Sequence, residues 1–493
     1  MLLTNLLLSI AFVTSAHAQD DQALKALEAG RTQRLSEEKV LELFRKDSVG
    51  TKRERAQAAL TQLDSSLTRE TYQARAYSTV NVKRSQEQAQ NLYQPVLSPY
   101  EDWNVGVEKK LPLGAKLGLE AFGSKYSFAG GTVQDATLVG GRVKGEVDLW
   151  KNIFGTLDRA QLQSADARRR RAEVEEKVNL KKLELELRKA FWSFVALNRS
   201  IELSEELVKS AERQMQDARS RAREGAADRG EVARYQSQVE SRNTTKLLFM
   251  YQQEVALQTF ERQFTGFRSS EWSLDNASLA NKTNDVDQCM SMLRETTPPN
   301  LDHTNYDELI ELLKAETESE MRAAKRYANM DIKLLGEYQT TGVDTTYERA
   351  REETFADRRG GYHVGLQVSV PIGGTKNESE KHLLRAKKDS LEAQSEGLAN
   401  DLRSQHDTMI KAMLFLRMGL KNQIENSKNL NINYTTMLNK YRQGRIPVST
   451  LILEQDSLFQ SKLTEIDLRK QIVHVLLDYF SIFNQFPCRW NQI

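Results

Sequence analysis

The sequence predicts a mainly helical protein with a smaller β portion, arranged as two tandem repeats of strands, a long helix, a turn and a shorter helix. The long helices occupy two proline-free intervals, 155–225 and 374–444, and each follows a segment in which apolar and polar residues alternate. Each interval ends on a glycine, Gly225 or Gly444, as helices commonly do. A helix of about 70 residues is roughly 105 Å long, far more than an ordinary globular domain needs. The repeats therefore predict a protein that spans a distance.

The overall composition argues against some partners. The 493 residues carry 70 basic and 68 acidic side chains, a net charge of +2, so no bulk field favours nucleic acid. The two cysteines are too few for a disulfide scaffold or a metal cluster.

Residues 1–18 have the pattern of a secretory signal peptide. An apolar run at 6–13 precedes Ala16, His17 and Ala18, a small-x-small cleavage pattern, although no lysine or arginine stands before the run. The alternative is a membrane anchor, but the run is too short to cross ~30 Å of hydrocarbon. No later apolar run approaches ~20 residues, so a mature protein that crosses a membrane would do so as a closed β-barrel. Residues 19–71 then predict surface-packed helices.

Two segments change from helical to alternating periodicity. Segment 72–149 predicts four strands, and segment 330–373 predicts two. One face of each strand is apolar and the other polar, as Val143 beside Arg142 illustrates. Such strands suit a membrane barrel with a wet lumen. They suit a soluble sheet with one face on a core equally well.

Two helical hairpins are expected at 150–265 and 374–486. The first turns near Gly225, after which Asp228 caps the return helix, and the second turns near Gly444. Four arginines at 168–171 could attract anions or lipid headgroups, but pairing with the glutamates that follow them is the more ordinary role.

The remaining segments are shorter. Residues 266–329 predict a small belt outside the hairpins, and 487–493 a short tail. Cys289 and Cys488 each follow a return helix, so they either form a disulfide in an oxidising compartment or remain two separate buried thiols.

The sequence contains none of the common catalytic, phosphate-binding or metal-binding motifs. No two histidines are four residues apart, no glycine-rich phosphate loop opens a helix, and no Gly-x-Ser-x-Gly elbow occurs. We therefore predict no enzyme, no cofactor and no metal site.

Three short stretches, taken in their order and spacing, resemble those of a known protein family. They are Val-Asp-Leu-Trp-Lys-Asn at 147–152, Val-Ser-Val-Pro-Ile-Gly-Gly at 368–374, and Tyr-Arg-Gln-Gly at 441–444 followed by Leu451 and Leu453. Together with the repeat, they make the chain resemble the TolC-like outer membrane efflux proteins of Gram-negative bacteria over nearly all of its mature length.

The resemblance implies a homotrimer in the bacterial outer membrane that extends into the periplasm. Strands from three chains would close one barrel in outer-membrane lipid, and twelve helices would form a periplasmic tunnel, with the belt around it. The helix turns would dock a periplasmic adaptor (membrane fusion) protein and, through it, an inner-membrane pump. The docking residues would be Gly225, Asp228, Gly444, Arg445 and Pro447.

The chain departs from the family pattern in two places. Typical members have two strands per repeat, so four in the first repeat imply an 18-strand barrel, unless the hairpin at 112–114 is periplasmic or lies outside the wall. Known members often narrow the tip with an aspartate nine residues after the turn glycine, where this chain has Leu453. Glu231, Tyr441 and Glu454 are the candidate constriction residues, with Asp228 beside them, although a helix cap or an interhelix contact explains each as well.

The predicted function is the exit duct of a tripartite efflux or type I secretion system, a passive conduit across the periplasm and outer membrane. The alternative is a non-conducting periplasmic coiled-coil scaffold or adaptor. The exported substrate, whether drug, metal ion or protein, is not encoded in any recognisable residue pattern.

Overall fold

The computed structural model describes most of the chain in two compact units. The described residues are 33–84, 96–129, 135–225, 228–275, 277–295, 304, 306–327, 330–356, 360–370 and 375–483. The hairpin unit comprises Met1–Gln57, Glu176–Asp307 and Leu398–Ile493, and the sheet unit comprises Ala58–Glu175 and Glu308–Gly397. The predicted signal peptide, the tail at 487–493 and Cys488 lie outside the described residues.

The repeat is present with a constant register. The first hairpin consists of α4 (Thr156–Arg223, 68 residues) and α5 (Arg229–Gln263, 35 residues). The second consists of α9 (Thr375–Arg442, 68 residues) and α10 (Val448–Ile482, 35 residues). Every boundary of the second hairpin lies 219 residues after its counterpart in the first. The two hairpins therefore have the same helix lengths and the same turn position.

The hairpin unit is held by an aromatic core. Fully buried rings come from α4, α5 and α10, and they include Phe191, Phe194, Phe260, Tyr479 and Phe480. The smaller elements β1 (Gln33–Leu35), α2 (Glu37–Asp47), η2 (Ser269–Glu271), β6 (Trp272–Leu274) and α6 (Leu279–Glu295) belong to the same unit. Strand β1 pairs in parallel with β6. The short pieces on either side of the first hairpin thus pack on the helices.

A buried charged cluster also ties these small elements to α4. Glu37 Oε1 on α2 accepts a hydrogen bond from Arg188 Nε on α4 at 2.8 Å, and its Oε2 accepts one from Lys282 Nζ on α6 at 3.2 Å. Burial lowers the pKa of both cations, and the Glu37 carboxylate opposes that shift.

The sheet unit contains one antiparallel sheet of six strands in the order β2-β3-β4-β5-β7-β8. The strands are β2 (Ala74–Lys83), β3 (Val96–Leu111), β4 (Ala115–Ala129), β5 (Ala136–Asp148), β7 (Asp331–Asp344) and β8 (Gly360–Ser369). The expectation of four strands in the first repeat and two in the second is confirmed. The hairpin at 112–114 joins β3 to β4 within the sheet.

Helices complete the sheet unit. They include α7 (Asp307–Tyr327) and α8 (Tyr347–Ala356), with η1 (Ile153–Gly155) before α4 and most of α3 (Val49–Glu70). The arginine run lies on α4 and pairs mainly with α7: Arg168 contacts Glu316 at 3.0 Å and Glu320 at 2.9 Å, and Arg171 contacts Glu316 at 3.3 Å. Arg169 also pairs with Glu173 at 2.9 Å and Arg171 with Glu175 at 4.0 Å, so the run forms the expected pairs along α4 as well as the interhelix contact.

Two short connecting segments contain helices. The charged stretch between β7 and β8 contains α8, and the segment after α5 contains α6. The predicted belt at 266–329 contributes α6 to the hairpin unit and most of α7 to the sheet unit.

We predict that the aromatic core, rather than the turn end, sets the stability of the hairpin unit. Leu476→Ala on α10 removes a side chain with no exposed area and should cost about 2–5 kcal/mol, because a cavity remains. Leu453→Ala on the same helix, where the side chain is 64% exposed, should cost far less. The measurement is the midpoint of thermal loss of helical circular dichroism; equal midpoints for the two variants would contradict the assignment of the core.

Candidate channel wall and helix-turn gate

The sheet has one face that is apolar and open. A row of directly paired residues crosses all six strands: Ala76, Val107, Leu119, Val143, Tyr338 and Tyr362. From Val107 to Tyr362 these side chains are between 46% and 84% exposed. A soluble sheet would cover such a face with a core. The exposed row therefore favours a lipid-facing wall.

The opposite face carries a network of charges. Glu120 Oε2 on β4 accepts hydrogen bonds from Tyr77 on β2 at 2.6 Å and from Lys144 on β5 at 2.7 Å. Arg142 on β5 lies 3.7 Å from Glu120 and 3.0 Å from Glu337 on β7. Further ion pairs on this face join Lys116 to Glu108 and Lys333 to Glu146. This face is built for contact with water.

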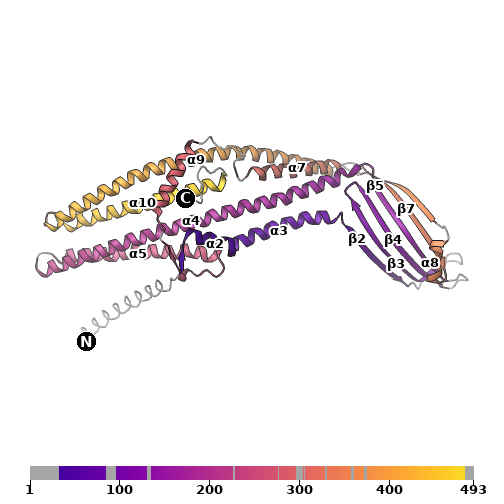
Figure 1. Ribbon diagram of the computed structural model, residues 1–493, viewed down its shortest axis with the longest axis horizontal. Helices are drawn as coiled ribbons and strands as arrows, with labels where there is room; N and C mark the ends of the chain where they lie inside the picture. The colour runs from indigo at the N-terminus through magenta and orange to yellow at the C-terminus, as the bar shows by residue number, and fades with distance from the viewer. Residues whose placement is uncertain are drawn as a thin grey trace, which may run out of the picture. The chain divides into compact units, whose positions relative to one another are not determined.

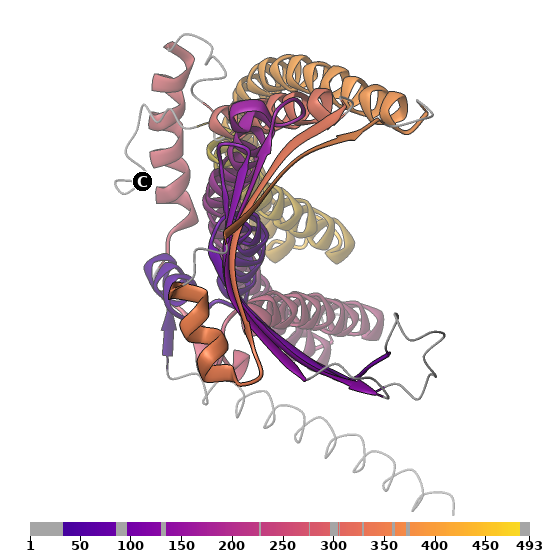
Figure 2. The ribbon, with the colours of Figure 1, turned by 90° about the vertical axis from the view of Figure 1, so that its right-hand side faces the viewer.

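The curvature of the sheet orients the two faces. Figure 2 shows the strands bent into an arc with α8 against the convex side. Helix α8 touches the apolar face, because Thr354 Oγ1 donates to the carbonyl of Val139 at 3.0 Å and the ring of Tyr347 lies 6.3 Å from that of Trp103. The apolar face is therefore convex and the charged face concave, as the wall of a water-filled pore requires.

The helix turns use left-handed glycines. The φ angle is +76° at Gly225 and +69° at Gly444, and a Cβ at either position would meet no atom within 4 Å. The glycines are required by the backbone angle and not by crowding. After Gly444, the N–H of Arg445 donates to the carbonyl of Lys440 at 2.9 Å, which closes the end of α9.

The predicted docking residues all lie on the surface of these turns. Asp228 caps α5, since its Oδ1 accepts a hydrogen bond from the backbone N–H of Glu231 at 2.8 Å. Pro447 stands at the N-cap of α10 without a side-chain cap. These two residues, together with Gly225, Gly444 and Arg445, are exposed. Figure 1 shows both turns at the same end of the hairpin unit.

Next to the turns, three polar side chains join the two hairpins. Arg221 Nη2 on α4 donates to Glu231 Oε1 on α5 at 2.7 Å and also to the hydroxyl of Tyr441 on α9. The Tyr441 hydroxyl donates to the same Glu231 oxygen. The Arg221 guanidinium lies 4.8 Å from the centre of the Tyr441 ring, within range of a cation–π contact. We call these three residues the turn link.

A small cluster of buried side chains packs against the Tyr441 member of the turn link. Tyr235, Ala218, Val448 and Leu451 are buried against Tyr441, and the Tyr235 and Tyr441 rings are 6.3 Å apart. Burial, reinforced by the hydrogen bond to Glu231, raises the pKa of Tyr441, so its hydroxyl keeps its proton at neutral pH. A protonated hydroxyl is what the donation to Glu231 requires.

The third constriction candidate behaves differently. Glu454 on α10 accepts a hydrogen bond from Asn433 on α9 at 2.5 Å, so it fastens the two helices of one hairpin. Among the predicted candidates, only Glu231 and Tyr441 come together between hairpins. Arg221 was missed by the sequence analysis; its position four residues before the turn glycine was the available signal.

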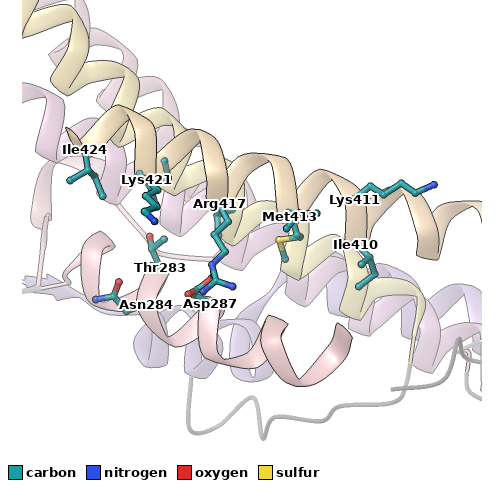
Figure 3. A pocket seen from close by; sticks show the side chains of 12 residues that line it. Thr283, Asn284, Asp287, Ile410, Lys411, Met413, Arg417, Lys421 and Ile424 are labelled. Atoms are coloured by element: carbon teal, nitrogen blue, oxygen red, sulfur yellow. The ribbon is translucent and has the colours of Figure 1, made fainter. Parts of the chain in front are cut away.

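A groove of about 340 Å³ lies elsewhere in the hairpin unit, between α6 and α9. Figure 3 shows Ile410, Met413 and Ile424 of α9 along it, and Arg417 reaching Asp287 of α6 at 2.7 Å. In the described part of the chain no three His, Cys, Asp or Glu residues are placed to hold a metal ion. No helix there is both long and apolar enough to cross a membrane.

Solved structures share this arrangement. A membrane protein from Pseudomonas aeruginosa matches with a TM-score of 0.66 and 16% identity, over 91% of this chain and 90% of that one. The outer membrane protein VceC from Vibrio cholerae matches with a TM-score of 0.66 and 12% identity, over 91% and 97%. The Campylobacter jejuni CmeC outer membrane channel matches with a TM-score of 0.66 and 10% identity, over 91% and 86%. The chain has the TolC-like fold. No protein-family model and no curated protein matches the sequence itself.

Within the TolC-like fold, the positions that sequence reasoning assigned to the two turns are confirmed as turns, while their roles stay predictions. The side chain of Cys289 on α6 is buried, whereas Cys488 lies outside the described residues, so the bridge between them also stays a prediction.

We predict that Glu231 strengthens the turn link that joins the two hairpins. Glu231→Gln removes the negative charge that Arg221 contacts. It should weaken the local structure by about 1 kcal/mol and speed backbone hydrogen exchange by roughly fivefold, since the site is partly exposed. The faster exchange should appear at the ends of both α4 and α9.

Glu454→Gln is the matched control, because its contact lies inside the second hairpin. It should speed exchange in α9 and α10 alone. An effect of Glu231→Gln confined to the first hairpin would mean that the turn link does not join the two.

Proposed function

We propose that this chain is one subunit of an outer-membrane exit duct, a passive conduit of a tripartite efflux or type I secretion system. The observation that carries the proposal is the six-stranded sheet, with an open apolar convex face and a charged concave face. Two hairpins with 68-residue helices extend the same chain by a length suited to a periplasmic tunnel. Substrates would pass through without chemical change.

The edges of the sheet support assembly with further copies. Strands β2 and β8 form the two edges, and both have ten residues. They run in opposite directions, because the strands between them alternate. Open edges leave backbone groups unpaired, which no membrane-spanning sheet tolerates. Three copies joined β8 to β2 would close an 18-strand barrel from six strands each.

The turn end of the hairpin unit is the proposed docking site for a periplasmic adaptor. The exposed turn residues, including Arg445 and Pro447, would dock the periplasmic adaptor, which in turn contacts the inner-membrane pump. Separation of Arg221 and Glu231 from Tyr441 would let the hairpins part and open the conduit. The turn link is the gate in this proposal.

Conductance tests the conduit directly. The purified protein in a planar lipid bilayer should give discrete conductance steps, and Glu231→Gln should raise the open fraction because it loosens the turn link. Glu454→Gln should leave the open fraction near that of the wild type. Recovery of the protein in the soluble periplasm without conductance would support the non-conducting scaffold and end the duct proposal.

Cysteine pairs test the closure of the barrel. Residues opposite one another on neighbouring strands have Cβ atoms about 5 Å apart, near enough for a disulfide after slight adjustment. Ala76→Cys on β2 combined in turn with Tyr362→Cys, Val364→Cys or Leu366→Cys on β8 scans the apolar face. One of these pairs should give covalent dimers and trimers on mild oxidation in membranes.

A cysteine pair on opposite faces of the sheet is the control for these cross-links. Ala76→Cys with His363→Cys places the two thiols on opposite faces of the sheet, so no cross-link should form. If every same-face pair fails while the protein still conducts, the copies meet along other edges.

A further inference from the structure

Helix α8 occupies a defined level on the apolar face. It follows β7 at the end of the sheet opposite Asp148, where β5 leaves the sheet toward α4. Gly342 on β7 admits the helix, because a Cβ there would lie 2.0 Å from the carbonyl oxygen of Ala350. The N–H of Val343 also donates to Glu353 at 3.3 Å. The helix is therefore packed firmly on the sheet and is not a loose loop.

The rows of this face that α8 leaves open form a band of limited height, in which Lys109 on β3 is the one charged residue among those paired with the rows of β7 named next. On β7 they begin at Thr340 and continue through Tyr338, Gly336 and Leu334 to Ile332. Five rows two residues apart extend about 27 Å along a strand, close to the ~25 Å apolar band of membrane barrels. Helix α8 thus marks one boundary of the band that hydrocarbon would cover.

The outward surface of α8 does not suit hydrocarbon. Ala350 and Thr354 are buried against the sheet, while Glu348, Arg349, Arg351 and Glu352 are exposed. Burying such charges in lipid tails is costly, so this surface belongs at the level of the headgroups.

Aromatic side chains reinforce that placement. Phe355 is 86% exposed on α8, and Tyr347 is 47% exposed at the start of the helix. Aromatic residues collect where the apolar band of a membrane barrel meets water.

We propose that α8 is an interfacial anchor that binds phosphorylated lipid headgroups of the leaflet at this end of the sheet. Arg349 and Arg351 would contact the phosphates, and Phe355 would insert at the boundary between headgroups and tails. Three glutamates (Glu348, Glu352 and Glu353) outnumber the two arginines and give the helix a net charge of −1, so recognition depends on the arginines themselves and not on a bulk field. The proposal rests on the membrane insertion of the sheet argued above.

Depth-dependent quenching tests the anchor in the full-length protein reconstituted into vesicles. An environment-sensitive fluorophore on Phe355→Cys should be quenched most by lipids that carry a nitroxide near the headgroup. The same fluorophore on Leu119→Cys, one row inside the open apolar band, should be quenched more by lipids that carry the nitroxide on the acyl chain than by those that carry it near the headgroup.

The two positions separate the two proposals. Loss of quenching at both positions would show that the sheet is not in the membrane, so the proposed function fails. Deep quenching at Leu119→Cys with none at Phe355→Cys would keep the membrane wall and overturn the anchor.

The arginines are tested by lipid composition. Quenching at Phe355→Cys should rise when vesicles of phosphatidylcholine are replaced by equal parts of phosphatidylcholine and phosphatidylglycerol. Addition of Arg349→Gln and Arg351→Gln should abolish that rise, whereas addition of Glu348→Gln and Glu352→Gln should preserve it. An unchanged rise in the arginine variant would refute phosphate recognition by these side chains.

Discussion

The stability of the sheet depends on something outside this chain that covers its apolar convex face. Val107, Leu119 and Val143 lie side by side on the convex face, and nearly half or more of each side chain is open. Burial of apolar area at roughly 25 cal/mol per Å² is the main force that stabilises folded proteins, so a face of this kind is stable only against lipid or a partner. The charged concave face argues for water on the other side. The sheet thus needs an apolar environment on its convex face and water on its concave face. This requirement limits the environments in which the sheet is stable.

The repeat accounts for the four long and return helices but not for the turn link. With the constant offset of 219 residues, Arg221 corresponds to Lys440, Tyr441 to Ala222 and Glu231 to Thr450. None of the three residues of the turn link is reproduced in the other repeat. The two hairpins are therefore equivalent as scaffolds and different at the turn, which allows Tyr441 of one to meet Arg221 and Glu231 of the other without a second, competing copy of the same contact.

Much of the fold follows from local patterns in the sequence. The long helices are proline-free and end at Gly225 and Gly444, and strand alternation was strong enough to give six strands. Helix α8 was missed because it buries only Ala350 and Thr354, too little for a helical apolar stripe to be visible in ten residues. The turn link was found only in part, since the contact of Arg221 with Tyr441 joins residues 220 positions apart. Such pairing depends on how the hairpins pack, which no local pattern encodes.

The distribution of buried residues decides where the hairpins can separate. Around Phe191 and Phe480 the core draws on α4, α5, α9 and α10 together, and its rings are almost fully buried. Near the turns the buried cluster is far smaller, with Tyr235, Tyr441 and Leu451 as its main members. Local opening costs least where few apolar contacts are lost, so the turn end can part while the rest of the hairpin unit stays packed. A gate at this end would therefore need a polar clasp such as that of Arg221 and Glu231 with Tyr441, because apolar packing alone is too sparse there to keep the two hairpins together.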